Sequence, residues 1–160
     1  GAFYRLGIDA PDLAREMADF FSVERDTQVC PFPGAIDTIR TLRDRGVRLA
    51  LITNGEARGQ RKKIDRHGLA QLFDHILIEG EFGLGKPDER VYLNALDRLS
   101  ANSNDSWMVG DNLEWEIAAP QRLGLRGVWV DNTGSGLPAS STVTPDYIIR
   151  ALPELLQWLG

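Results

Sequence analysis

Residues 107–116 read WMVGDNLEWE, and the fold assignment starts from this stretch. A short apolar run ends at Gly110-Asp111, and a second carboxylate, Glu116, follows at the expected start of a helix. Open α/β sheets bind their ligands at the carboxyl ends of their strands, where such an acidic turn would lie. Magnesium in proteins usually takes one or two carboxylates and keeps several waters. The stretch therefore predicts half of a phosphoryl-transfer site, with the other half to be found upstream.

The composition of the chain fits one soluble globular domain. Its 160 residues are enough to bury a core, and 42% apolar with 26% charged residues is ordinary for a folded protein. The net charge of −5 gives no basic surface for nucleic acid, and no apolar run approaches the roughly 20 residues that cross a bilayer. Cys30 is the only cysteine, which excludes an intrachain disulfide. We expect a cytoplasmic protein that binds neither nucleic acid nor membranes.

Strand-like and helix-like hydrophobic patterns alternate along the chain. Short apolar, β-branched runs end at turns, and amphipathic segments follow them. The predicted strands are 47–52, 75–78, 107–110, 127–130 and 147–149, and the predicted helices are 12–22, 35–45, 56–67, 88–100, 114–123 and 151–159. Segments 79–87 and 132–145 are predicted to be loops. This alternation predicts an α/β fold of three layers, with a doubly wound parallel sheet in the middle.

Three loops that follow predicted strands carry side chains suited to a phosphate. They contain Thr53-Asn54-Gly55, Lys86, and Asp111 with Glu116. Because parallel strands share a carboxyl edge, we expect the three loops to meet there. Backbone N–H groups, a hydroxyl and a lysine would spread the charge of the phosphate oxygens, while Mg²⁺ on the acidic pair would hold one of them.

Each of these residues also has a simpler structural explanation. Asp111 could cap a helix, and Glu116 could be a solvated first-turn residue favoured by the helix dipole. Thr53 could merely end a strand, and Lys86 could be a solvated loop lysine. Their shared position after predicted strands favours the site over these explanations.

Residues 80–86, GEFGLGK, offer a competing motif. They match the first seven positions of a P-loop, but Pro87 stands where Ser or Thr should bind Mg²⁺. Glu81 would also place negative charge beside the phosphates. We therefore reject a nucleotide triphosphatase.

Residues 31–131 resemble the haloacid dehalogenase-like (HAD) superfamily, in the branch with a helical cap inserted early in the chain. The resemblance rests on LALITNG, GKPDERVY and VGDNLEWE, which look like the second, third and fourth motifs of that family. It implies a Rossmann-like HAD core over residues 31–160 and a small helical cap remnant over residues 1–30.

The resemblance also implies roles for the residues already singled out. The Thr53 hydroxyl and the following backbone N–H would hold the phosphate, with Asn54 and Gly55 among the substrate-binding residues. Lys86 would stabilise the nucleophile and the transferred group. Thr53 and Lys86 would thus be catalytic, while Asp111 and Glu116 would bind Mg²⁺. Glu116 stands where the family usually has Asp, so its contact with the metal could run through water.

One motif of the family is absent. The first motif is Asp-x-Asp on an N-terminal strand, its first Asp is the nucleophile, and no Asp-x-Asp occurs in this sequence. In the resembled fold that strand lies between strands 47–52 and 107–110. We therefore expect a core that lacks its first strand, in which those two strands do not pair directly. A missing N-terminal segment or another chain is expected to fill the slot, and the 160 residues are expected to be a fragment.

The implied function is Mg²⁺-dependent hydrolysis of a small phosphorylated metabolite through an aspartyl-phosphate. The nucleophile would lie outside this stretch, so the fragment alone is expected to be inactive. Two alternatives stay open. The first is a degenerate, non-catalytic module that binds phosphate or a protein, and the second is a 2-haloacid dehalogenase, which works without a metal.

Overall fold

The helices and strands described here come from a computed structural model that describes residues 30–159. The chain divides into two units, Gly1–Cys30 and Pro31–Gly160, and the following concerns the second. The predicted helix 12–22 and the predicted cap remnant lie outside the described residues, apart from Cys30 at the boundary.

All five predicted strands are present. They are β1 (Ala50–Thr53), β2 (His75–Ile78), β3 (Trp107–Gly110), β4 (Arg126–Val130) and β5 (Tyr147–Ile149). The α-helices are α3 (Ala35–Asp44), α4 (Ala57–Arg66), α5 (Glu79–Phe82), α6 (Glu89–Arg98) and α7 (Ala119–Gln121). Leu113–Ala118 forms a π-helical turn, η3, and the 3₁₀ turns are η1 (Ala70–Leu72), η2 (Ser103–Asp105) and η4 (Leu152–Gln157). The alternation predicted from the sequence is thus confirmed.

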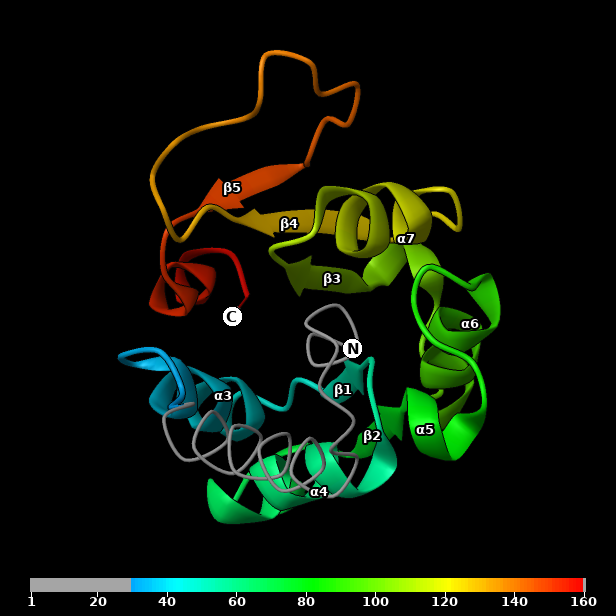
Figure 1. The fold of residues 1–160 in the computed structure, drawn as a ribbon. Coiled ribbons are helices and arrows are strands. Elements are labelled where there is room, and N and C mark those ends of the chain that lie inside the picture. Colours follow the sequence, from blue (N-terminus) through cyan, green and yellow to red (C-terminus); the bar gives the residue numbers. More distant parts are fainter. Residues whose placement is uncertain (1–29, 160) are drawn as a thin grey trace, which may run out of the picture. The chain divides into compact units, whose positions relative to one another are not determined.

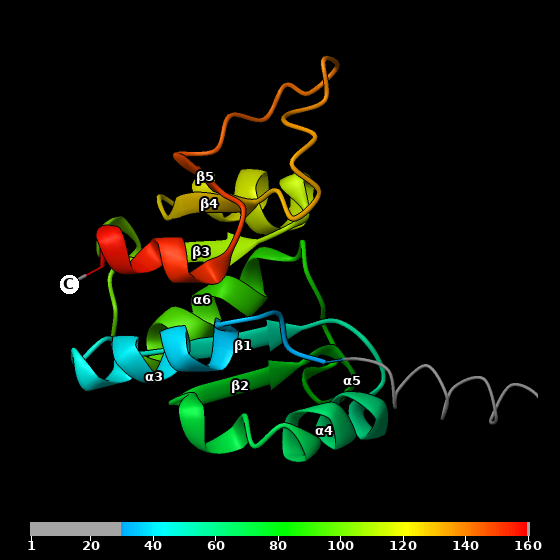
Figure 2. The same ribbon diagram turned by 90° about the vertical axis from the view of Figure 1, so that its left-hand side faces the viewer.

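The strands form two parallel sheets, β1-β2 and β3-β4-β5. Thr53 pairs with Ile78 at the end of β1, and Gly110 pairs with Trp129 at the end of β3. Within residues 30–159, β1 pairs with β2 and β3 pairs with β4, and no β1–β3 pairing is present. Figures 1 and 2 show the β3 edge of the larger sheet turned toward the β1 edge of the smaller one. The predicted core without its first strand agrees with this arrangement.

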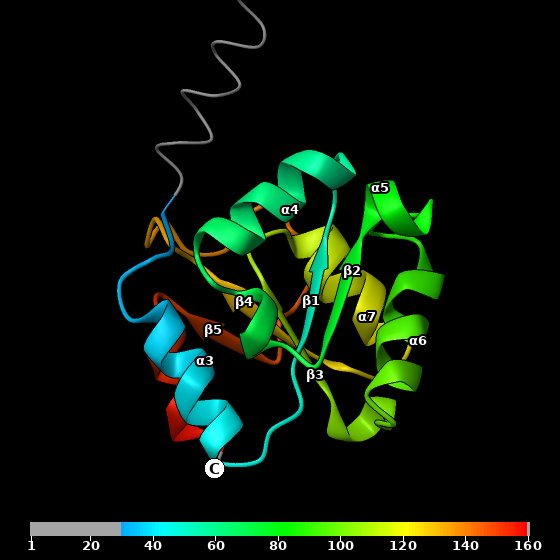
Figure 3. The same ribbon diagram turned by 90° about the horizontal axis from the view of Figure 1, so that it is seen from below.

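Helices on both faces hold the two sheets together. On one face, α6 contacts β1 and β2, and its Val91 and Tyr92 belong to a core cluster that also includes Ile52 of β1 and Met108 of β3. On the other face, α3 packs against η4 (Figures 1 and 3). There the Arg45 guanidinium donates hydrogen bonds to the carbonyls of Leu156 and Leu159. The two sheets therefore belong to one packed unit, although their facing strands do not pair.

The strands differ in how much of each is buried. Every residue of β1 and of β3 is half-buried. In contrast, β2 has Leu77 and Ile78 buried, and residues 127–129 of β4 are buried. Central strands of a parallel sheet are normally buried on both faces, so the half-exposure of β1 and β3 places an uncovered edge between them.

Two predicted boundaries shift because side chains intervene. The strand predicted at 47–52 begins at Ala50, since the N–H of Leu49 donates to the Asp74 carboxylate and Val47 still bonds the end of α3. The loop predicted at 79–87 contains α5, whose short length and acidic residues give no clear hydrophobic period.

Two predicted helices take other forms. Pro120 lacks an N–H and interrupts the helix predicted at 114–123. The N–H of Ala119 donates to the Glu114 carbonyl, five residues back, so residues 113–118 form a π-helical turn. The closing helix predicted at 151–159 is the 3₁₀ turn η4, held by the Glu154 carboxylate on the N–H groups of Arg150 and Ala151. No described helix is long and apolar enough to cross a membrane.

Candidate active site

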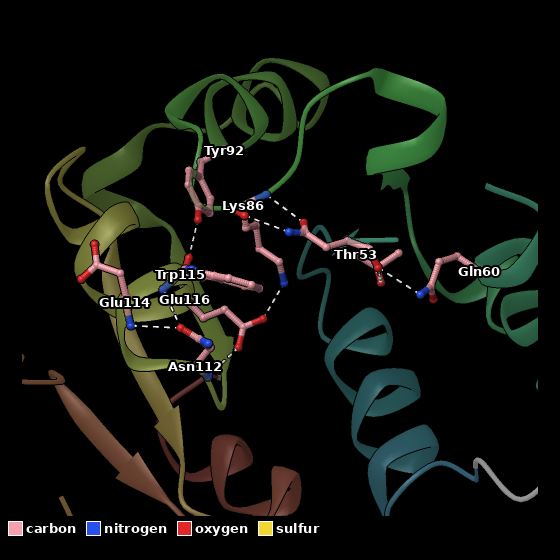
Figure 4. A network of polar contacts seen from close by, with 9 residues as sticks. Thr53, Gln60, Lys86, Tyr92, Asn112, Glu114, Trp115 and Glu116 are labelled. Atoms are coloured by element: carbon pink, nitrogen blue, oxygen red, sulfur yellow. Dashed lines mark hydrogen bonds and ion pairs between the residues drawn. The ribbon is translucent and has the colours of Figure 1, made fainter. Parts of the chain in front are cut away.

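The first loop of the predicted site begins at Thr53, the last residue of β1. The Thr53 hydroxyl lies 3.4 Å from the Asn54 carbonyl oxygen, and the Gln60 side chain donates to the same oxygen at 3.0 Å (Figure 4). Glu56 caps α4 by accepting hydrogen bonds from two N–H groups of its first turn. Gly55 between them has φ +124°, a conformation that side chains disfavour. Hydrogen bonds to residues of α4 therefore fix the turn at residues 54–56.

Asn54 joins this loop to the Lys86 loop. The Asn54 amide nitrogen donates to the Lys86 carbonyl oxygen at 2.8 Å, and the Lys86 N–H donates to the Asn54 amide oxygen at 2.8 Å. Gly85 leaves room for this exchange, because a Cβ there would lie 2.9 Å from the Asn54 amide atoms. Lys86 precedes a cis peptide bond to Pro87, after which Asp88 caps α6. Two of the predicted loops are thus in direct contact.

Lys86 joins the second loop to the third. Its ammonium lies 2.5 Å from Oε1 of Glu116, and the side chains are only 8% and 13% exposed (Figure 4). The other oxygen, Oε2, accepts the N–H of Asn112 at 2.9 Å. A Cβ on Gly110 would lie 2.0 Å from Oε2, so only glycine fits beneath the carboxylate. Glu116 therefore points back under the turn that follows β3.

The π-helical turn η3 sets the position of Glu116. The Asn112 side chain accepts hydrogen bonds from the N–H groups of Glu114 and Trp115, and the Tyr92 hydroxyl of α6 donates to the Trp115 carbonyl. Burial raises the pKa of Tyr92 well above its usual value, and the nearby Glu116 charge adds to this, so Tyr92 stays a neutral donor. Single π-helical turns are frequent at functional sites, and this one orients a side chain of the predicted site.

Asp111 lies exposed at the turn directly after β3. Its carbonyl accepts a hydrogen bond from the Trp129 indole at 2.9 Å, which ties the turn to β4. Within residues 30–159, no group of three or more His, Cys, Asp or Glu side chains could hold a metal ion. Two carboxylates with waters would still fit Mg²⁺, but both oxygens of Glu116 already have protein partners. The metal role of Asp111 and Glu116 stays a prediction.

The structure brings most of the predicted site together. Asn54, Lys86 and Glu116 form one chain of contacts, and Glu116 reaches the residue next to Asp111. Thr53 lies one residue before Asn54 at the end of β1. The structure shows where these residues lie, and their roles in binding and catalysis stay predictions.

Glu79 is the residue that the sequence analysis missed. Its Oε2 accepts the N–H of Gly55 at 2.8 Å, so the backbone N–H of this predicted substrate-binding residue already has a partner. A signal was present, because Glu79 directly follows strand 75–78 and so shares the carboxyl edge with Thr53. The sequence pattern predicts a loop at 79–87, and no spacing rule links Glu79 to Gly55.

Comparisons with known proteins agree with this architecture. Residues 4–124 match the haloacid dehalogenase-like hydrolase family. A phosphoserine phosphatase of Thermus thermophilus is 39% identical over 147 residues, or 91% of this chain and 57% of the relative. The chain spans about half the length of the curated relatives that it matches, 57% of this phosphatase and 46% of a rat N-acylneuraminate-9-phosphatase.

Two solved structures share the fold. A HAD phosphatase from Thermococcus onnurineus is 26% identical with a TM-score of 0.76, covering 99% of this chain and 68% of that one. A 2-haloacid dehalogenase from Pseudomonas syringae pv. Tomato DC3000 is 33% identical with a TM-score of 0.74, covering 91% and 59%. The family match includes all three loops of the site, so the resemblance stated from the sequence is confirmed. This chain belongs to the haloacid dehalogenase-like hydrolase family.

Proposed function

We propose that the full-length protein that contains this chain hydrolyses a small phosphorylated metabolite, with Mg²⁺ as its cofactor. The observation that carries the proposal is the contact chain from Asn54 through Lys86 to Glu116, which unites three loops that follow β1, β2 and β3. The phosphatase names of several relatives support the same reaction class.

Each residue of the site has a role in this proposal. The Thr53 hydroxyl and the Asn54 N–H hold phosphoryl oxygens, and the Lys86 ammonium offsets their negative charge. Glu116 holds Lys86 in place, and Asp111 provides the carboxylate for Mg²⁺, with Glu116 beside it. Bound Mg²⁺ would supply positive charge to the phosphoryl oxygens as a Lewis acid.

The nucleophile is proposed to be an aspartate outside the described residues. Its carboxylate oxygen attacks phosphorus, the P–O bond to the metabolite breaks, and the departing oxygen takes up a proton. Water then attacks phosphorus and releases inorganic phosphate and the free carboxylate. We place this aspartate on an extended segment between β1 and β3, from a preceding part of the natural polypeptide or from another chain. The half-exposed facing strands support this placement, since unpaired buried backbone groups cost on the order of 1–3 kcal/mol each.

Two observations favour other functions. The sequence lacks Asp-x-Asp, which favours a non-catalytic module that binds a phosphorylated ligand or a protein. The likeness to a 2-haloacid dehalogenase at 33% identity favours dehalogenation. Metal dependence separates the two hydrolases, because turnover of 2-chloropropionate that survives EDTA would identify a dehalogenase.

The test is a turnover assay of the full-length natural protein with p-nitrophenyl phosphate and Mg²⁺. We expect hydrolysis that EDTA abolishes and that restored Mg²⁺ recovers, and negligible hydrolysis by the 160-residue chain alone. Absence of turnover at every substrate concentration would contradict the phosphatase and favour the binding module. Mg²⁺-dependent hydrolysis by the 160 residues alone would show that the nucleophile lies within them.

A further inference from the structure

Glu79 and its neighbour Gly80 hold both backbone groups of Gly55. The Glu79 carboxylate accepts the Gly55 N–H at 2.8 Å, and the Gly80 N–H donates to the Gly55 carbonyl oxygen at 3.0 Å. These two residues begin α5, directly after β2. The peptide groups on either side of Gly55 are therefore fixed by the neighbouring strand's loop.

The packing around Glu79 leaves it little freedom. A Cβ on Gly85 would lie 2.6 Å from the Glu79 carboxylate carbon and 2.9 Å from the Asn54 amide. A Cβ on Gly80 would lie 2.5 Å from the backbone nitrogen of Ala57. Two residues without side chains thus let the backbone come close enough for Glu79 to reach Gly55.

This arrangement changes which groups of the loop can bind an anion. A carboxylate that accepts an N–H makes a strong, charge-assisted hydrogen bond, so the Gly55 N–H is committed to Glu79. The contact of the Thr53 hydroxyl with the Asn54 carbonyl is long at 3.4 Å, so the hydroxyl gives up little by turning to a ligand.

We propose that Glu79 is a positioning residue, which holds the Gly55 peptide so that the Thr53 hydroxyl and the Asn54 N–H, and not the Gly55 N–H, bind the phosphoryl oxygens. This inference rests on the proposed function. A Cβ on Gly85 would meet both the Glu79 carboxylate and the Asn54 amide, whose oxygen accepts the Lys86 N–H, so Glu79 and the lysine loop come together at Gly85.

The test compares Glu79→Ala and Glu79→Gln in the full-length protein with Glu81→Gln. Glu81 lies on the same short helix, but its carboxylate pairs with Arg61 at the surface. Steady-state hydrolysis of p-nitrophenyl phosphate gives kcat and KM, and NMR hydrogen exchange reports the Gly55 amide. Small misplacements of positioning groups cost up to about 100-fold in rate, so we expect Glu79→Ala to lose about 10- to 100-fold in kcat with little change in KM.

Glu79→Gln keeps an acceptor oxygen and should recover most of kcat, and Glu81→Gln should match the wild type. The Gly55 amide should exchange slowly in the wild type and in Glu81→Gln, and quickly in Glu79→Ala. Equal Gly55 exchange in Glu79→Ala and the wild type, an unchanged kcat, or a loss in Glu79→Gln as large as in Glu79→Ala would overturn the proposal. A wild type without turnover would overturn the proposed function instead, and Gly55 exchange would still decide whether Glu79 fixes the loop.

Discussion

The facing strands β1 and β3 and the strands that pair with them, β2 and β4, differ in burial. The facing strands are half-exposed along their whole length, whereas their partners β2 and β4 contain buried residues such as Ile78 and Val128, both 0% exposed. A parallel sheet normally has its least exposed strands in the middle. Here the two strands that face each other are the more exposed ones, which indicates that this fold is least complete between β1 and β3.

The proposed chemistry lies at the same junction. Thr53 and Gly110 end the two facing strands; Asn54 after β1 bonds the Lys86 backbone, and the Lys86 ammonium pairs with Glu116 beyond β3. Segments that bind ligands commonly belong to the least stable parts of a fold. Changes to the facing strands β1 and β3 should therefore affect both the stability of the fold and the proposed activity.

Loss of the ion pair should have the largest effect on activity. In the full-length protein, Lys86→Ala should lower kcat by about 10²- to 10³-fold, as expected for removal of one charge-stabilising donor. The matched control is Lys62→Ala on the exposed face of α4, which should keep wild-type kcat. Steady-state kinetics check both variants, and a kcat within threefold of the wild type for Lys86→Ala would remove the lysine from the mechanism.

The same variant leaves Glu116 largely buried without its cation. Breaking a buried pair from one side costs about 3–5 kcal/mol of unfolding free energy. The double variant Lys86→Met with Glu116→Leu should recover most of that stability in urea unfolding but none of the activity. Recovery of activity would mean that the pair serves stability alone.

If an additional strand lies between β1 and β3, a core truncation in β1 should cost as much unfolding free energy as one in its partner β2. Leu77→Ala in β2 removes a side chain that is 3% exposed, and Ile52→Ala in β1 removes a half-exposed one. In the full-length protein we expect both to cost about 2–5 kcal/mol, because a central strand would cover Ile52. Urea unfolding measures the two costs, and a much smaller cost for Ile52→Ala would argue against a strand in the slot.

Gly110→Ala tests the contact beneath Glu116 alone. The added Cβ would lie 2.0 Å from Oε2, so the carboxylate must move away from Lys86. Overpacking of this kind costs about 1–3 kcal/mol, and kcat should fall with it. Gly59→Ala is the control, because its Cβ meets Glu56 at 3.4 Å and alanine favours a helix by about 0.5–1 kcal/mol. Equal thermal stability of the two variants would contradict the close packing.

Asp88, which caps the helix that packs on both sheets, should give the smallest effect. The hydrogen bonds from Arg90 lower the pKa of Asp88 from 3.8 to about 2. Since the pKa of Asp88 is depressed in the folded state, the ionised carboxylate contributes its full stabilisation of the fold above pH 3.8. This stabilisation is lost as the pH falls toward 2. Asp88→Ala should lower Tm by a few degrees at pH 7, and the difference from the wild type should shrink in scans at pH 3 and 2. A Tm difference between Asp88→Ala and the wild type that stays the same at all three pH values would mean that the carboxylate charge does not stabilise the fold.

The sequence predicted the sheet well because strand periodicity is a local signal. Runs such as 75–78 and 107–110 alternate with helices, and the structure has strands at those residues. Thr53, Lys86 and Asp111 could be found because each closely follows a strand or its loop. Pro120 interrupts the helix predicted at 114–123, and the π-helical form of the turn before it follows from hydrogen bonds that the sequence does not specify.

Contacts between distant residues could not be predicted in this way. Glu79 holds Gly55 across 24 positions, and Lys86 holds Glu116 across 30. No spacing rule connects such pairs, since their contact depends on how the two sheets are placed. For the same reason, the sequence pattern that predicts Gly55 as a substrate-binding residue does not show that Glu79 holds its N–H.

A crystal structure of the full-length protein with Mg²⁺ and tungstate would test the central claim most directly. The account predicts one tungstate ion in contact with the Thr53 hydroxyl, the Asn54 N–H and the Lys86 ammonium, beside a magnesium ion on Asp111. Tungstate bound elsewhere, or Thr53, Lys86 and Asp111 too far apart to share one ion and its metal, would contradict it.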